Sequence, residues 1–317
     1  MYASRNNVIK EDGEEEKETL VGKILSIELA KIQEIKQEKE ELIEENKVAE
    51  NNKQNTEEEN ISIEVSTNVQ TQIVTQNPIA ESYNTEINGV KIKNESSFEI
   101  NNSILETPMN INKENILIFH THTCESYTPS EQFQYQQTGN FRTTDLNYSI
   151  ARVGDELASC LTSYGFNVAH DKTYHDYPAY SGSYTRSAKT VENVLKTNSG
   201  DIIIDLHRDA IGSKSNYDPS VKIGEDVAAQ LMFVIGTNGG GLWHPNWNQN
   251  LKFAIKIQQK ANEMYPGLFK PIILRNSRYN QHLGKAACIV EVGATGNTLE
   301  QCLVSIKYLS KVIDEVM

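Results

Sequence analysis

Three short stretches of this chain place histidine and carboxylate side chains directly after apolar runs. The first is ILIFHTHTCESY, residues 116–127, which carries His120, His122 and Glu125. The second is DIIIDLHRD, residues 201–209, which carries His207, and the third is CIVEVG, which carries Glu291. Two imidazoles and a carboxylate on one metal ion, with a free carboxylate nearby, form the donor set of a zinc hydrolase. These three ligands leave a fourth position on the metal ion for a water molecule. The free carboxylate then serves as the general base.

These stretches belong to a region, from Asn115 onward, in which apolar runs alternate with amphipathic patterns. We expect strands at 116–120, 166–170, 201–207, 230–236, 271–275 and 288–293, and helices at 145–163, 185–197, 248–264 and 298–316. Unbroken Ile, Leu and Val strands between helices predict an α/β fold with a mostly parallel (mixed) sheet and helices on both faces. Because the carboxyl ends of parallel strands share one edge, we expect the three polar stretches to converge there.

The first part of the chain has a different composition. Residues 1–60 hold 17 acidic and nine basic residues and one aromatic, Tyr2. Apolar residues at near-heptad spacing predict a solvated helix there, which we interpret as an acidic helical stalk, with a partner-binding helix as the alternative. Residues 61–113 predict a polar linker with a small strand or hairpin near 89–100. The catalytic domain is then expected over 114–317.

Composition excludes some classes of protein. The net charge of −13 argues against nucleic acid or an anionic membrane surface as the main partner. No run approaches the roughly 20 apolar residues of a membrane span and no signal peptide opens the chain, so we expect a soluble chain, with any anchor preceding it. The cysteines form no CxxC motif, and we expect free thiols. Cys124 lies inside the first motif, but a thiolate nucleophile is the less favoured interpretation.

Four motifs, in order, resemble those of the stage II sporulation protein P family over about residues 110–317: HTHTCESY, DIIIDLHRDA, HPNWNQNLKFA and YNQHLGKAACIVEVGATGNT. The resemblance implies a cell-wall hydrolase with an amidase-like fold, related to zinc-dependent N-acetylmuramoyl-L-alanine amidases. It implies cleavage of the amide between N-acetylmuramic acid and the L-alanine of the peptidoglycan stem, and of peptide cross-links. It also implies a role in engulfment during sporulation, at the extracytoplasmic face of the cell membrane, with sporulation proteins D and M as partners.

Carried over residue by residue, the resemblance makes His122 and His207 zinc ligands and Glu291 the catalytic glutamate. His120 either orients the site or replaces His122 as the ligand, and alternation along a strand predicts that both rings face one side. The related amidases take a ligand glutamate from the start of the next helix, where this chain reads RTTDLNYSIA and has no glutamate. Glu125 is therefore the expected third ligand, with Asp145 as the alternative. Asp205 and Asp209 are expected to support the ligand imidazoles.

Both tryptophans of the chain, Trp243 and Trp247, lie within residues 239–247. Their rings would suit binding of a glycan or peptide stem, and the alternative is a loop anchored by two rings in the core. Two other functions stay open from the sequence. A zinc metallocarboxypeptidase would need Arg275 and Arg278 to hold a terminal carboxylate, and a non-catalytic scaffold of the engulfment machinery would need no site at all.

Overall fold

The central element of this protein is a large mixed sheet. The computed structural model describes residues 70–75, 78–113, 115–211 and 216–317. Within these ranges eight strands pair in the order β2-β3-β10-β9-β11-β6-β4-β5. Their bounds are β2 Thr85–Ile87, β3 Val90–Asn94, β4 Asn115–Phe119, β5 Asn167–His170, β6 Ile202–Asp209, β9 Leu231–Gly236, β10 Ile272–Arg275 and β11 Ala286–Ala294. A smaller antiparallel sheet joins β1 (Thr71–Ile73), β7 (Ser220–Ile223) and β8 (Asp226–Ala229).

The large sheet has two halves that run in opposite directions. β5, β4, β6 and β11 are parallel neighbours. β9 pairs antiparallel with β11, and β10 and β3 continue parallel to β9. The predicted α/β fold with a mixed sheet is confirmed, and each predicted strand is present. The small β1-β7-β8 sheet is not among the predicted elements.

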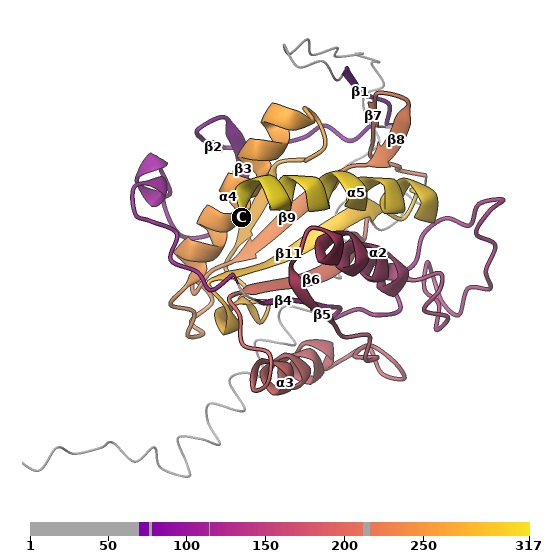
Figure 1. Ribbon diagram of the computed structural model, residues 1–317, viewed down its shortest axis with the longest axis horizontal. Helices are drawn as coiled ribbons and strands as arrows, with labels where there is room; N and C mark the ends of the chain where they lie inside the picture. Colours follow the sequence, from indigo (N-terminus) through magenta and orange to yellow (C-terminus); the bar gives the residue numbers. More distant parts are fainter. Residues whose placement is uncertain (1–69, 76–77, 114, 212–215) are drawn as a thin grey trace, which may run out of the picture.

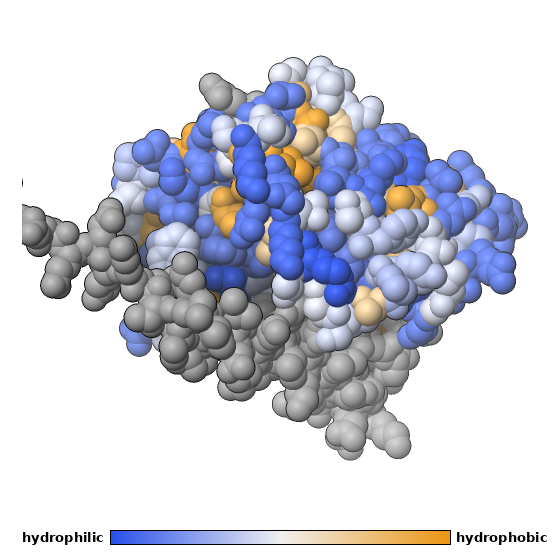
Figure 2. Space-filling model, turned by 90° about the horizontal axis from the view of Figure 1, so that it is seen from below, coloured by the Kyte–Doolittle hydropathy of each residue, from blue (hydrophilic) through white to orange (hydrophobic). Residues whose placement is uncertain are grey.

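The described helices cover both faces of the sheet. They are α2 (Ile150–Ser163), α3 (Ser183–Leu195), α4 (Trp247–Met264) and α5 (Leu299–Val316), with short 3₁₀ turns at Asn102–Leu105 and Gln281–Leu283. α2, α4 and α5 lie together on one face, whereas α3 lies by itself on the other (Figure 1). The surface seen from below, the side of α3, is largely hydrophilic with separate apolar patches (Figure 2).

Alternate residues of β4 show why its sequence is an unbroken apolar run. Ile116 and Ile118 are fully buried in the core shared with α2, α4 and α5. Leu117 and Phe119 point to the other face, where they pack with Val191 of α3. A strand covered on both faces needs apolar side chains at every position.

Helix α2 begins at Ile150, five residues later than the predicted start. The Ser149 side chain accepts a hydrogen bond from the Ala151 backbone N–H at 3.2 Å and caps the helix there. Asp145 lies upstream of this cap, in a turn in which its Oδ1 accepts from the Asn147 N–H at 3.0 Å. The segment that precedes the cap is therefore a loop.

The segment before β4 adds a hairpin to the sheet. β2 and β3 are antiparallel and are joined at Asn88 and Gly89, whose positive φ angles of 49° and 80° suit an Asn-Gly turn. β3 then pairs with β10. The predicted strand or hairpin is thus present, at a slightly earlier position. The predicted helix over 1–60 lies outside the described residues, and the domain boundaries stay predictions.

None of the helices in the described part of the chain is both long enough and apolar enough to cross a membrane.

Candidate active site

The three polar stretches of the sequence meet on three adjacent parallel strands. β4, β6 and β11 are neighbours, and the register pairs Glu291 directly with His207 and Phe119 with Asp205. A cavity of about 270 Å³ lies at this position. His122, Glu125, His207 and Glu291 all line it. The structure therefore brings together four of the residues that the sequence singled out.

A tight turn after β4 carries the first motif into the cavity. Thr121 donates to the Asp205 carboxylate from its backbone N–H at 2.8 Å and from its hydroxyl at 2.6 Å, and these bonds turn the chain away from the strand direction. The Glu125 N–H then donates to the His122 carbonyl at 3.1 Å. Glu125 is a buried residue, 5 % exposed, and its carboxylate accepts a hydrogen bond from the Arg208 backbone N–H at 2.9 Å. The turn thus delivers an imidazole and a carboxylate to one cavity.

His207 is surrounded by carboxylates. Its Nδ1 lies 3.7 Å from Glu125 Oε2, and its Nε2 lies 2.9 Å from Asp205 Oδ1. His207 Nε2 therefore faces Asp205, and Nδ1 faces Glu125. Burial alone lowers the pKa of His207, but Asp205, Glu125 and Glu291 outweigh it and raise that pKa to about 10. The carboxylates around His207 therefore raise the affinity of its ring for a proton.

Glu291 is a buried group of the cavity lining with an unused polar atom. Its Oε2 is buried and accepts no hydrogen bond from the described part of the chain. Burial raises the pKa of Glu291, and His207 opposes this effect. A carboxylate with raised proton affinity in a cleft is the usual state of a general base or acid.

The donor chemistry of the cavity fits a zinc ion. His122, His207 and Glu125 supply two imidazoles and a carboxylate, the combination found in catalytic zinc sites with an open position. His207 Nδ1 faces Glu125 Oε2 at 3.7 Å, so two of these donors are adjacent in the cavity. Among the residues that the structure describes, no three His, Cys, Asp or Glu side chains are spaced as a complete ligand set. The rings of His122 and His207 stand at 87° with centroids 5.3 Å apart.

His120 has a different environment from His122, and the expectation that both face one side is wrong. Its Nδ1 bonds to the Leu206 carbonyl at 2.9 Å and its Nε2 to His170 Nε2 at 2.8 Å. It does not line the cavity, as far as the chain is described. β4 ends at Phe119, so strand alternation does not extend to residue 122. The structure thus gives no support to His120 as a ligand, and it joins His120 instead to the β5 side of the sheet.

The sequence profile described as "Stage II sporulation protein P (SpoIIP)" matches residues 7–314. The chain belongs to this family. It is 28% identical over 201 residues to stage II sporulation protein P of Bacillus subtilis (strain 168). That match covers 60% of this chain and 47% of the relative, so the chain spans about half the length of the curated relative that it matches.

Several solved structures of amidases are similar to this chain, at low sequence identity. The CwlD amidase from Clostridioides difficile, in complex with the GerS lipoprotein, gives a TM-score of 0.41 at 12% identity, covering 63% of this chain and 94% of that chain. The N-acetylmuramoyl-L-alanine amidase AmiC2 of Nostoc punctiforme gives 0.38 at 10% identity, covering 65% of this chain and 96% of that chain.

The remaining acidic candidates of the sequence lie outside the ligand cluster. Asp145 is exposed in its turn and is not among the described residues that line the cavity. Asp205 supports the site by holding Thr121 and by its position beside His207. Asp209 lines the cavity and pairs with Lys270 Nζ at 2.9 Å. Glu125 lines the cavity together with His122 and lies 3.7 Å from His207 Nδ1.

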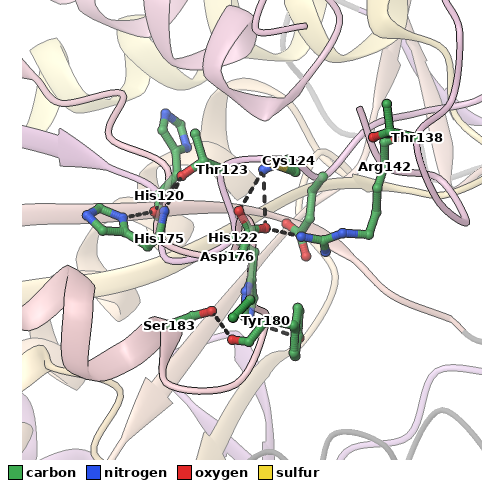
Figure 3. Close-up of polar contacts among 12 residues, drawn as sticks. His120, His122, Thr123, Cys124, Thr138, Arg142, His175, Asp176, Tyr180 and Ser183 are labelled. Carbon is green, nitrogen blue, oxygen red and sulfur yellow. Dashed lines mark hydrogen bonds and ion pairs between the residues drawn. The ribbon is translucent and has the colours of Figure 1, made fainter. Parts of the chain in front are cut away.

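Cys124 is buried and bound by its neighbours. Its backbone N–H lies 3.2 Å from an oxygen of Asp176, which also forms an ion pair with Arg142 (Figure 3). Burial, and then the Asp176 charge, raise the pKa of the Cys124 thiol to about 12. The group stays protonated near neutral pH, which argues against a thiolate nucleophile.

The two tryptophans are not in the part of the cavity lining that the structure describes. They follow β9, and because β9 is antiparallel to β11, the end of β9 lies at the opposite end of the sheet from Glu291. Trp247 stacks near Phe98 at 4.9 Å and packs against the core, whereas Trp243 is 69% exposed. A substrate-binding role for these rings stays a prediction. Both rings lie away from the described lining of the cavity.

Two tyrosines line the cavity instead. Tyr180 stacks on His122 with ring centroids 4.5 Å apart, and its hydroxyl lies 3.1 Å from His122 Nε2. Tyr184, at the start of α3, meets the same ring edge-on at 5.8 Å. Both belong to the tyrosine-rich run of residues 164–184. Of this run, Tyr180 in the loop before α3 and Tyr184 in α3 contact the His122 ring.

Proposed function

We propose that this chain is a zinc-dependent peptidoglycan hydrolase that acts during sporulation. It cleaves the amide bond between N-acetylmuramic acid and the L-alanine of the stem peptide. It also cleaves peptide bonds in the cross-links. One observation carries the proposal. In a member of the stage II sporulation protein P family, His122 and Glu125, in the turn after β4, line the same cavity as His207 and Glu291 on the parallel strands β6 and β11.

Each side chain has a role that follows from its position. His122, His207 and Glu125 would hold zinc, which supplies Lewis-acid polarisation of the scissile carbonyl and activation of water. Glu291 accepts a proton from the attacking water and delivers it to the amine nitrogen as the C–N bond breaks. The Arg208 N–H fixes the Glu125 carboxylate, and Asp205 fixes the turn that carries His122. Tyr180 and Tyr184 restrict the orientation of the His122 ring.

The cellular setting is proposed from the family. The chain would act at the extracytoplasmic face of the cell membrane, at the sporulation septum and the engulfing membrane. Sporulation proteins D and M would be its partners, and peptidoglycan its substrate. The acidic balance of the chain is consistent with a partner other than nucleic acid.

A zinc metallocarboxypeptidase is the second candidate, and one observation favours it. Arg275 lines the same cavity as the proposed ligands, where a guanidinium suits a terminal carboxylate. The Arg278 guanidinium instead lies 3.5 Å from the Trp243 carbonyl. The two functions differ in their products, because an amidase releases whole stem peptides and a carboxypeptidase releases single amino acids.

Digestion of purified sacculi with the zinc-loaded protein tests the proposal. Mass spectrometry of the soluble fraction should show stem peptides with a free L-alanine amine and glycan strands without peptide. Glu291→Gln serves as the inactive control. Release of single amino acids would favour the carboxypeptidase, and the absence of any released product would count against both enzymes and leave the scaffold.

A further inference from the structure

A chain of ring contacts leads from His122 to Arg142. The Tyr180 ring stacks on His122, with their planes 7° apart, and the Tyr184 ring meets His122 edge-on. Tyr180 is 40% exposed, so burial in the core contributes little to holding its ring. The Arg142 guanidinium lies over this ring, 5.1 Å from the centroid, which is the distance of a cation–π contact. Arg142 thus contacts the side chain that covers His122 (Figure 3).

Backbone pairing places Arg142 beside the turn of the proposed metal site. Residues 141–143 run antiparallel to residues 124–126, and two backbone hydrogen bonds of 2.9 Å join these segments. Arg142 stands opposite Glu125 in this pairing. The backbone of Arg142 is therefore attached to the turn that carries His122 and Glu125.

Asp176 ties the loop that precedes α3 to the same turn. Its side chain is fully buried, forms an ion pair with Arg142 and accepts a hydrogen bond from the Cys124 N–H at 3.2 Å (Figure 3). A buried carboxylate needs such partners, because an uncompensated charge in the interior is costly. From the other side, Arg186 of α3 donates to three backbone carbonyls of residues 175–181, at 2.5 to 3.0 Å. Both the backbone of this loop and the arginine over its ring are thus fixed.

The orientation of the His122 ring depends on these contacts more than that of His207 does. His207 lies within strand β6, whereas His122 follows the end of β4. We propose that Arg142 is a positioning residue of the metal site. Anchored by Asp176, it holds the Tyr180 ring in place, and this ring holds His122 in the orientation that binds zinc. The inference rests on the proposed function, because it takes His122 as a zinc ligand.

Zinc affinity, measured by competition with a chelator, tests this role without any hydrolysis. Groups that hold a ligand imidazole typically change metal affinity by about 10–100-fold, so we expect a loss of this size in Tyr180→Ala and of about tenfold in Arg142→Gln. Tyr180→Phe keeps the stacked ring and should restore most of the affinity. Tyr164→Ala is the matched control, because Tyr164 is also 40% exposed and has Lys311 over its ring, but lies outside the described lining of the cavity.

A double-mutant cycle separates positioning through Tyr180 from a general structural role. If Arg142 acts through this ring, adding Arg142→Gln to Tyr180→Ala should change the zinc affinity by less than about twofold. The visible spectrum of the cobalt-loaded protein should change alike in both single variants and return in Tyr180→Phe. Additive losses of affinity would mean that Arg142 acts by another route, such as its neighbour Glu125, and would overturn the inference.

Two further outcomes are distinguishable. An unmodified protein that binds no zinc would overturn the proposed function together with this inference, whereas zinc binding that neither Tyr180→Ala nor Arg142→Gln weakens overturns this inference alone. If Arg142→Gln does not fold because the buried Asp176 has lost its cation, the combination of Arg142→Gln with Asp176→Asn takes its place in the cycle. That combination removes both charges and leaves no buried carboxylate uncompensated.

Discussion

Glu291 and His207 are direct cross-strand partners on the parallel strands β11 and β6. Because paired residues share a face, the carboxylate and the imidazole look into the same cavity without any help from loops. Rigid strands hold a catalytic pair more precisely than loops do. His122 and Glu125, by contrast, depend on the turn that Thr121 and Asp205 form. Glu291, the proposed base, and His207 are thus held by rigid strands. The positions of His122 and Glu125 are set by one buried turn.

The affinity for zinc should depend on pH through His207. Below its pKa of about 10 both nitrogens of the His207 ring carry a proton, and one of these two protons must leave when a ring nitrogen binds a metal ion. Affinity should therefore rise with pH, by up to about tenfold per pH unit between pH 6 and 8. Competition with a chelator across this range measures the slope. Asp205→Asn removes one of the charges that raise this pKa and should flatten the slope, whereas a pH-independent affinity would show that His207 is not a ligand.

Glu291→Gln should separate catalysis from metal binding. The amide has nearly the shape of the carboxylate but cannot accept the proton, so activity on sacculi should fall by roughly 10²–10⁴-fold. Zinc content, measured by atomic absorption, should stay near that of the unmodified protein. Loss of zinc together with activity would make Glu291 a ligand and would reopen the role of Glu125.

The apolar strands could be predicted from the sequence because both of their faces are buried. Ile116, Leu117, Ile203 and Ile204 all lie in core clusters, and their unbroken run is the signal. The convergence of His122, His207 and Glu291 followed from parallel strand ends. The direction of β9 could not be predicted, because an apolar run has the same pattern whether it pairs parallel or antiparallel. The expected place of the tryptophans depended on that direction.

The orientation of His120 could not be predicted for a related reason. The strand β4 ends at Phe119 because Thr121 bonds to Asp205, a residue 84 positions away. A contact of this range leaves no local signal in the sequence.

The two histidines of the first motif should respond differently to substitution. His122→Ala should lose zinc and activity, because it removes a ligand. His120→Ala should keep zinc but lose stability, by about 1–3 kcal/mol, because the buried Leu206 carbonyl and His170 lose a partner. Urea unfolding and zinc titration of both variants measure the two effects. Loss of zinc from His120→Ala with retention in His122→Ala would reverse the assignment.

A small change in α2 tests the packing around His120. Alanine normally stabilises a helix relative to glycine by about 1 kcal/mol. At Gly154 a Cβ atom would lie 2.4 Å from His170 Nε2 and 2.8 Å from His120 Nε2, which is too close. Gly154→Ala should therefore destabilise the protein, by about 1–3 kcal/mol. Ser159→Ala, at an exposed position of the same helix, should be neutral or slightly stabilising in the same urea titration.

Truncation from the N-terminus should be tolerated up to residue 69 but not up to residue 90. Each strand and helix described above lies beyond residue 69, so removal of 1–69 should leave a cooperatively unfolding domain that binds zinc. Removal of 1–90 also deletes β2, including the fully buried Ile87, and Glu81, which lines the cavity. Burying one isoleucine contributes about 1.5–3 kcal/mol, so the shorter chain should unfold at clearly lower temperature. Equal thermal midpoints for the two truncations would show that the β2-β3 hairpin contributes nothing to the stability of the sheet.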